Sequence, residues 1–190
     1  MKLLRIALAG AFALASMVLP AAAAPDDFLT IQLKDGPVVV QLMPEVAPKH
    51  VAQIKALAAK GEYDNVVFHR VIDGFMAQTG DVQFGKEGSS RFNPQRAGMG
   101  GSSLPDIPAE FSKVPFERGV VGMARSQDPN SANSQFFIMF TRYPSLDNQY
   151  TVVGKVVSGM EHVDKIKRGQ GGNGEVTNPD KMIKVSVGKQ

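Results

Sequence analysis

The 190-residue chain contains no cysteine and no tryptophan, and it has only three histidines, His50, His69 and His162. The absence of cysteine excludes thiol chemistry, disulfide bonds and every metal site with cysteine ligands. The histidines are widely spaced in the sequence, so we expect no metal site. Without tryptophan, the chain lacks the largest aromatic surface for stacking, which disfavours a barrel that binds sugars or nucleic acids.

A long hydrophobic run is also absent. The apolar stretch Ile6–Leu19 has about 14 residues, fewer than the roughly 20 that cross a bilayer. Lys2 and Arg5 precede this stretch, and four alanines follow it at residues 21–24. The pattern predicts a secretory signal peptide over residues 1–24, cleaved near Ala23/Ala24. We therefore expect an exported chain without stable membrane insertion, whose residues 25–190 form a single domain.

Charge of one sign is not in excess in the expected mature chain. Beyond residue 24, the sequence has 19 basic and 18 acidic residues. Nucleic-acid-binding domains carry a concentrated basic face, so this balance predicts no nucleic-acid partner.

The hydrophobic pattern is typical of a mainly β protein. Residues 28–33 and 38–42 read as two strands, and Asp35-Gly36 between them is a strong signal for a hairpin. Apolar residues then recur at helical spacing from Val51 to Ala58, and Gly61 is a plausible end of that helix. Further short strands and one short helix near Met160 follow without regular βαβ alternation. This order favours an antiparallel sheet of about eight strands, closed into a barrel with helices at its ends.

No motif for hydrolysis or phosphate binding is present. The serines lie outside any G-x-S-x-G context, and the glycine-rich residues 80–108 match neither a P-loop nor a dinucleotide fingerprint. We interpret that segment as a long surface loop beside a site, and His69 as a structural residue. Arg70 lies among aromatic residues in the stretch FHRVIDGFMAQTGD. It is either a rim arginine with its charge in water or a functional hydrogen-bond donor.

Three segments distinguish these two interpretations. FHRVIDGFMAQTGD, GMARSQDPNSANSQFFIMF and SLDNQYTVVGKVVSGM, in this order and spacing, resemble the cyclophilin family of peptidyl-prolyl isomerases. The resemblance extends from Phe28 to Val187. It implies an eight-stranded antiparallel closed β-barrel capped by two α-helices, and the activity of a peptidyl-prolyl cis-trans isomerase (EC 5.2.1.8) without cofactor or metal.

The resemblance also implies roles for individual residues. Arg70 stands at the position of the catalytic arginine of the family. The substrate-binding positions are Phe75, Met76, Gln78, Ala124, Arg125, Gln135, Phe137, Leu146 and Tyr150. Among them, the apolar residues are expected to line the proline pocket, and the two glutamines to contact the substrate backbone and hold the arginine. Ala124 and Arg125 are expected to pair with the bound peptide through their backbone.

Two positions depart from the family pattern. Ser145 stands where many eukaryotic members carry a tryptophan that binds the inhibitor cyclosporin, so we expect weak cyclosporin binding with activity retained. Tyr150 stands where many members have a histidine, and a flat ring with a polar tip is kept there.

The sequence therefore predicts an isomerase that assists the folding of exported proteins in a bacterial periplasm. Its partners would be proline-containing, unfolded or partly folded polypeptides, and we expect it to act as a monomer. The alternative is a peptide-binding chaperone of the same fold that acts without catalysis.

Overall fold

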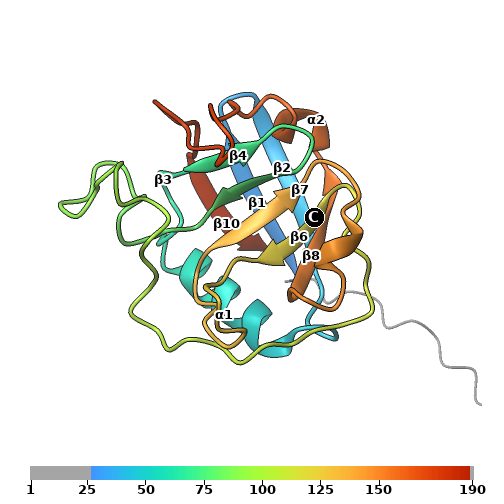
Figure 1. Ribbon diagram of the computed structural model, residues 1–190. Coiled ribbons are helices and arrows are strands. Elements are labelled where there is room, and N and C mark those ends of the chain that lie inside the picture. The colour runs from blue at the N-terminus through green and yellow to red at the C-terminus, as the bar shows by residue number, and fades with distance from the viewer. Residues whose placement is uncertain (1–26, 189–190) are drawn as a thin grey trace, which may run out of the picture.

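One antiparallel β-sheet of eight strands organises the chain in a computed structural model that describes residues 27–188 (Figure 1). The expected signal peptide, residues 1–24, lies outside the described residues. The strand order across the sheet is β10-β1-β2-β8-β6-β7-β5-β4. In that order the strands are Lys184–Gly188, Phe28–Leu33, Gly36–Leu42, Val152–Ser158, Val120–Met123, Phe136–Met139, Met76–Thr79 and Arg70–Ile72.

The N-terminal hairpin agrees with the prediction. β1 and β2 pair from Phe28↔Gln41 to Leu33↔Gly36, so the turn lies at Asp35. Alternate residues of β1, from Leu29 to Leu33, are buried, because one face of the strand packs on the main core.

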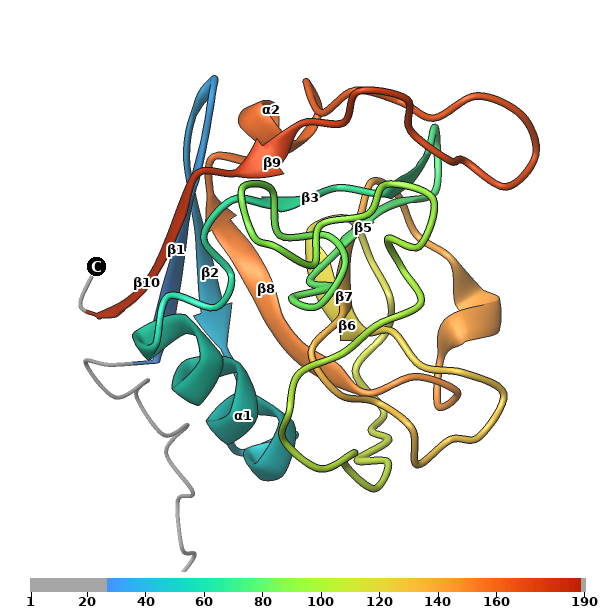
Figure 2. The same cartoon turned by 90° about the vertical axis from the view of Figure 1, so that its left-hand side faces the viewer.

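The two α-helices lie at opposite ends of the sheet (Figures 1 and 2). Helix α1, Pro48–Ala59, has proline in its first turn and buries an apolar face, as its sequence spacing predicts. Its first turn has no cap from the preceding residue. Instead the Glu110 carboxylate accepts the backbone N–H groups of Lys49 and His50, at 3.2 and 3.1 Å. Helix α2, Met160–Val163, has one short turn. No helix among residues 27–188 is long and apolar enough to cross a membrane.

The expected closure of the barrel is not confirmed. β10 and β4 form the two edges of the eight-stranded sheet, which is a half-barrel, and no ladder joins them within residues 27–188. The edge of β4 is occupied by a later segment: the Val71 N–H donates to the Gly174 carbonyl at 2.7 Å, and the Gly169 N–H donates to the Val71 carbonyl at 2.9 Å. These groups are therefore not available to β10.

A small second ladder lies beside the open edges of the sheet. β3, Val66–Val67, pairs with β9, Lys181–Met182, as Figure 2 shows. β3 leads along the chain into β4, and β9 leads into β10. The two sheet edges are thus connected through these two short strands and not through a ladder of their own.

The two faces of the sheet carry different hydrophobic cores. In the strands β4, β5 and β7, Val71, Ala77 and Ile138 are opposite one another and belong to the main core inside the curved sheet. Their sequence neighbours point to the other face, because successive side chains alternate across a strand. There Met76, Phe137 and other residues form a second, smaller cluster. This outer cluster is the floor of the candidate site.

Candidate functional site

One row of opposite residues crosses four strands on the outer face. Arg70 on β4 is opposite Gln78 on β5, Gln78 is opposite Phe137 on β7, and Phe137 is opposite Gly122 on β6. Directly opposite residues of antiparallel strands share a face and lie in contact distance. The sheet register therefore brings the arginine, the glutamine and the aromatic ring into one line.

Gly122 leaves space at the end of this row. A Cβ atom at this position would lie 2.5 Å from Phe116 and 2.6 Å from Phe137, so only glycine fits. The two rings stack there with their centroids 5.8 Å apart. Phe116 is fully buried below the site, and sequence reasoning missed it because it lies in a loop without strand periodicity.

A cavity of about 180 Å³ opens above this floor. It is lined by nine of the ten residues singled out in the sequence: Arg70, Phe75, Met76, Gln78, Ala124, Arg125, Phe137, Leu146 and Tyr150. Leu146 reaches it from the short 3₁₀ helix η1, Pro144–Leu146. The tenth residue, Gln135, lies behind Gln78 and does not line this cavity.

Neutral acceptors hold the Arg70 side chain. Its Nε–H donates to the Asn173 carbonyl at 2.9 Å, and Nη1 donates to the Gln78 side-chain oxygen at 3.2 Å. Nη1 also lies 3.9 Å from the sulfur of Met76, a weak acceptor. The donors of Nη2 have no partner among the described residues. A guanidinium has five N–H donors, so this arrangement leaves donors for a ligand.

The charge of Arg70 is not neutralised within residues 27–188, where it forms no ion pair. Burial lowers the pKa of the guanidinium, and the electrostatic interaction with Tyr150 opposes that change. Because arginine starts from a pKa above about 12, the group remains charged at every physiological pH. The cavity therefore holds a permanent positive charge beside an apolar wall.

A relay of amide groups connects Arg70 to the long loop after β5. The Gln78 oxygen accepts from Arg70, while its Nε2 donates to the Gln135 oxygen at 3.0 Å. Gln135 Nε2 then donates to the carbonyls of Gly98 and Gly100, at 2.9 and 2.7 Å. These contacts orient both glutamine side chains, so the acceptor that faces Arg70 is an oxygen.

Aromatic rings and one arginine form the rim of the cavity. The Tyr150 ring meets Phe137 edge-on, with centroids 5.8 Å apart, and the Arg125 guanidinium lies 4.5 Å from the centre of the Tyr150 ring. Phe75 packs against Tyr143, with ring centroids 4.5 Å apart. Ser145 is exposed on η1, so it adds no wall of its own.

The backbone beside the cavity has a free edge. The Ala124 N–H donates to the Gln135 carbonyl at 2.9 Å, whereas the backbone N–H and carbonyl of Arg125 have no hydrogen bond within the described part of the chain. An extended peptide can add to such an edge through main-chain hydrogen bonds.

Acid–base groups are not available at the cavity. Burial lowers the pKa of His69 to about 4, so this side chain is neutral near pH 7. Asp147, near η1, is paired with Arg142 and accepts the Phe116 N–H; the Arg142 contact is the main cause of its lowered pKa. Residues 27–188 contain no group of three histidine or acidic side chains that could hold a metal ion.

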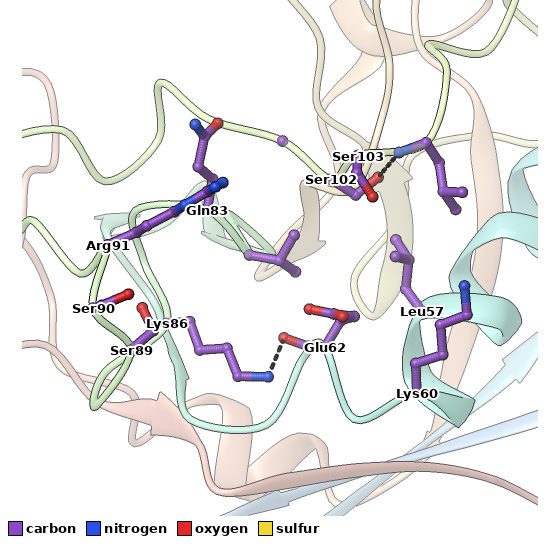
Figure 3. A pocket seen from close by; sticks show the side chains of 13 residues that line it. Leu57, Lys60, Glu62, Gln83, Lys86, Ser89, Ser90, Arg91, Ser102 and Ser103 are labelled. Atoms are coloured by element: carbon purple, nitrogen blue, oxygen red, sulfur yellow. Dashed lines mark hydrogen bonds between the residues drawn. The ribbon is translucent and has the colours of Figure 1, made fainter.

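A larger cavity of about 460 Å³ lies between the end of α1 and the loop after β5 (Figure 3). Lys86 lines it, but the Lys86 ammonium already donates to the Gly61 and Glu62 carbonyls, at 2.6 and 3.2 Å. The remaining wall is mainly polar and includes the exposed side chains of Lys60 and Arg91. The smaller cavity combines apolar walls with a fixed charged donor, so we take it as the candidate site.

The chemistry that this site can perform is limited by its composition. It can enclose a small apolar ring, pair with an extended backbone and donate hydrogen bonds from a permanent cation. It offers no activated nucleophile and no base. Such a composition suits the stabilisation of a polar or twisted conformation of a ligand without the breaking of a bond.

Comparisons with known proteins indicate one family. A sequence model described as "Cyclophilin type peptidyl-prolyl cis-trans isomerase/CLD" matches residues 28–187. A "Probable peptidyl-prolyl cis-trans isomerase" of Brucella suis is 58% identical over 192 residues, covering 98% of this chain and 97% of the relative. The "Peptidyl-prolyl cis-trans isomerase-like 3" of Gallus gallus is 39% identical over 141 residues, covering 74% of this chain and 81% of the relative.

Two solved structures share the fold. Cyclophilin AquaCyp293 from Hirschia baltica has a TM-score of 0.72 and 26% identity, covering 87% of this chain and 75% of that chain. A Cryptosporidium parvum cyclophilin-type isomerase, crystallised in the presence of the dipeptide Ala-Pro, has a TM-score of 0.73 and 26% identity, covering 86% of this chain and 99% of that chain.

Proposed function

Because the chain belongs to the cyclophilin-type peptidyl-prolyl cis-trans isomerases, we propose that Arg70 drives the isomerisation by donating a hydrogen bond to the twisted prolyl amide. The proposal rests on one observation. Arg70 is held by neutral acceptors at an apolar cavity, and its Nη2 donors have no partner among the described residues.

The reaction needs no covalent step. Rotation about an Xaa-Pro bond takes tens of seconds because amide resonance must be broken. Reaching milliseconds needs about a 10⁴-fold acceleration, or roughly 5.5 kcal/mol. As the bond twists, the prolyl nitrogen regains its lone pair and becomes an acceptor. A donor aimed at that nitrogen binds the twisted state more tightly than the planar states, which is the requirement for catalysis.

The surroundings of Arg70 favour this role. A carboxylate partner would offset the charge of the guanidinium, whereas the Gln78 oxygen and the Asn173 carbonyl leave that charge intact. The apolar walls formed by Phe75, Met76 and Phe137 lower the local dielectric constant and exclude water that would compete for the donor. Both effects strengthen the hydrogen bond in the transition state.

We further propose that the substrates are proline-containing, unfolded or partly folded polypeptides. The cavity has the size of a small ring, and the unpaired backbone of Arg125 offers an edge for the residues that flank the proline. The related structure crystallised with Ala-Pro supports a proline-containing ligand.

The first test is isomerisation of a short Xaa-Pro peptide, followed by NMR exchange. We expect the wild-type chain to accelerate it, and Arg70→Ala to reduce kcat/KM by about 100-fold or more, as the loss of a transition-state donor does in other enzymes. Arg91→Ala is the control, because Arg91 is exposed and lines the other cavity. An Arg70→Ala variant with wild-type kcat/KM would refute the mechanism.

The second candidate function is a peptide-binding chaperone of the same fold that acts without catalysis. The free backbone edge at Arg125 supports it, because that edge can bind an extended chain whether or not Arg70 acts. The same peptide experiment decides between the two. A wild-type chain that suppresses aggregation of an unfolded protein but leaves the isomerisation rate unchanged is a chaperone only.

We also propose that the enzyme acts in a bacterial periplasm on exported proteins. The support is the arrangement of Lys2 and Arg5, the apolar stretch Ile6–Leu19 and the alanines at residues 21–24. The full-length chain, expressed in a Gram-negative host, should be recovered from the periplasm with an N-terminus near Ala24 or Pro25. An uncleaved chain in the cytoplasm would contradict this proposal.

A further inference from the structure

A glycine-rich segment, residues 168–176, lies along the strand that carries Arg70, and we call it the C-terminal arm. Figure 2 shows the arm near the red end of the colour scale, and Figure 1 labels β4. Two backbone hydrogen bonds join the arm to β4: the Gly169 N–H donates to the Val71 carbonyl at 2.9 Å, and the Val71 N–H donates to the Gly174 carbonyl at 2.7 Å. A third joins it to the residue before β4, where the Val176 N–H donates to the His69 carbonyl at 3.1 Å. The arm is therefore fixed to both chain neighbours of Arg70.

The same arm also contacts the Arg70 side chain. The Asn173 carbonyl accepts the Nε–H of Arg70 at 2.9 Å, while Gln78 on β5 accepts from Nη1 at 3.2 Å. A guanidinium is a rigid plane, so two acceptors from different elements fix both its position and its rotation. The Nη2 donors remain for the substrate.

We infer that the C-terminal arm is a positioning element for catalysis, acting through the Asn173 carbonyl and dependent on glycine at residue 174. This inference rests on the proposed role of Arg70. Gln78 alone leaves the guanidinium free to swing about its Nη1 contact. The arm removes that freedom before the substrate binds, so less order has to be gained in the transition state.

Gly174 is the point at which the arm requires glycine. Its φ is +70°, in the left-handed region that L side chains rarely adopt, and an added Cβ would lie 2.3 Å from Ile72 Cγ1 and 2.9 Å from the Val71 carbonyl oxygen. Any side chain here pushes the arm away from β4. Gly172 differs in both respects: its φ is not in the left-handed region, and nothing lies within 4 Å of its added Cβ.

Arg168 anchors the start of the arm next to the β4–β5 turn. Its Nε donates to Asp73 at 2.9 Å, and Nη1 donates to the Asp164 carbonyl at 2.8 Å. The guanidinium also lies 4.0 Å from the centre of the Phe140 ring. Arg168 does not line the candidate cavity, so its replacement loosens the arm without touching the substrate.

The experiment compares Gly174→Ala with Gly172→Ala in the full chain. A misplacement of about 1 Å can cost about 100-fold, so we expect kcat to fall by at least about 10-fold in Gly174→Ala, with KM within about twofold of the wild-type value. Gly172→Ala should keep the wild-type kcat. The ¹⁵Nε–¹Hε resonance of Arg70 should shift and exchange faster with water only in Gly174→Ala, because this N–H loses its acceptor.

Arg168→Ala is a second variant that adds no clash, and it decides the question if Gly174→Ala does not fold. We expect it to lower kcat by about threefold, again with little change in KM, and to broaden the Arg70 Nε resonance. An active wild type with an unchanged kcat and Nε resonance in these variants would overturn the inference and leave the role of Arg70 intact. A wild type without isomerase activity would overturn both.

Discussion

At the scale of single residues, Arg70 and Asp81 show two opposite uses of a buried charge. Arg70 is half-buried and has only neutral partners, so its charge remains available to a ligand. Asp81 is fully buried, and its charge is satisfied by backbone donors. Its Oδ1 accepts the N–H groups of Gln83 and Phe84, at 3.0 and 2.9 Å, and its Oδ2 accepts those of Gly98 and Gly100, at 2.7 and 2.9 Å.

Asp81 therefore closes the long loop after β5, and the isosteric change Asp81→Asn tests this role. An amide retains one acceptor oxygen and places an NH₂ group against backbone donors, so about two hydrogen bonds to a charged group are lost. At 1.5–3 kcal/mol each, we expect the free energy of unfolding to fall by about 3 kcal/mol. Urea denaturation measures the loss, and limited proteolysis should cut the loop faster.

The control for this variant is Asp35→Asn, because Asp35 lies exposed in the β1–β2 turn. Its stability should remain within about 0.5 kcal/mol of the wild-type value. Since Gln135 binds the Gly98 and Gly100 carbonyls of the same loop, isomerase activity should also decrease in Asp81→Asn. An Asp81→Asn chain as stable as the wild type would show that the loop does not depend on the carboxylate.

At the scale of the elements, sequence patterns predicted the helices and hairpins that depend on contacts between residues close in the chain. The β1–β2 hairpin follows from Asp35-Gly36 between two strand-like runs, and α1 follows from its apolar spacing. The closure of the sheet could not be predicted in this way, because the residues that occupy the edge of β4 lie about a hundred positions later in the chain. Nothing in the sequence around Gly169 and Gly174 identifies Val71 as their hydrogen-bond partner.

The same difference between local patterns and long-range contacts applies to the candidate site. The resemblance to a known family supplied the side chains, and the structure brings nine of the ten around one cavity. Their roles in binding and catalysis remain predictions. The Asn173 carbonyl was missed, because a backbone acceptor has no sequence signature. Phe116 was missed for a related reason, since its stacking partner Phe137 is remote in the sequence.

At the scale of the whole molecule, two buried histidines and one partly buried carboxylate should make the free energy of unfolding decrease as the pH falls. Burial lowers the pKa of His50, which is fully buried, and lowers the pKa of His69 to about 4. Burial tends to raise the pKa of Glu110, but its bonds with His50 and with backbone N–H groups outweigh this, so the pKa of Glu110 is lowered. Each group binds protons more readily in the unfolded chain.

The stability that these groups contribute should therefore be fully present above about pH 6.5, the pKa of a histidine in the unfolded chain. It should decrease as the pH falls below that value. For His69, a pKa lowered from about 6.5 to about 4 corresponds to about 3 kcal/mol of stability, lost progressively down to about pH 4. Glu110 adds to the loss below about pH 4.5. Urea denaturation at pH 7.5, 6.0 and 5.0 measures the effect.

The contribution of His69 can be separated from the rest with His69→Gln, a polar side chain that does not titrate. This variant should lose less stability between pH 7.5 and 5.0 than the wild type, even if it is less stable at pH 7.5, because a packing defect shifts the whole curve while a removed proton site changes its slope. The control is His162→Gln, since the His162 side chain is 20% exposed, whereas His69 is buried. If the stability of His69→Gln decreases with falling pH in parallel with that of the wild type, burial of the neutral His69 imidazole does not cause the loss of stability in acid.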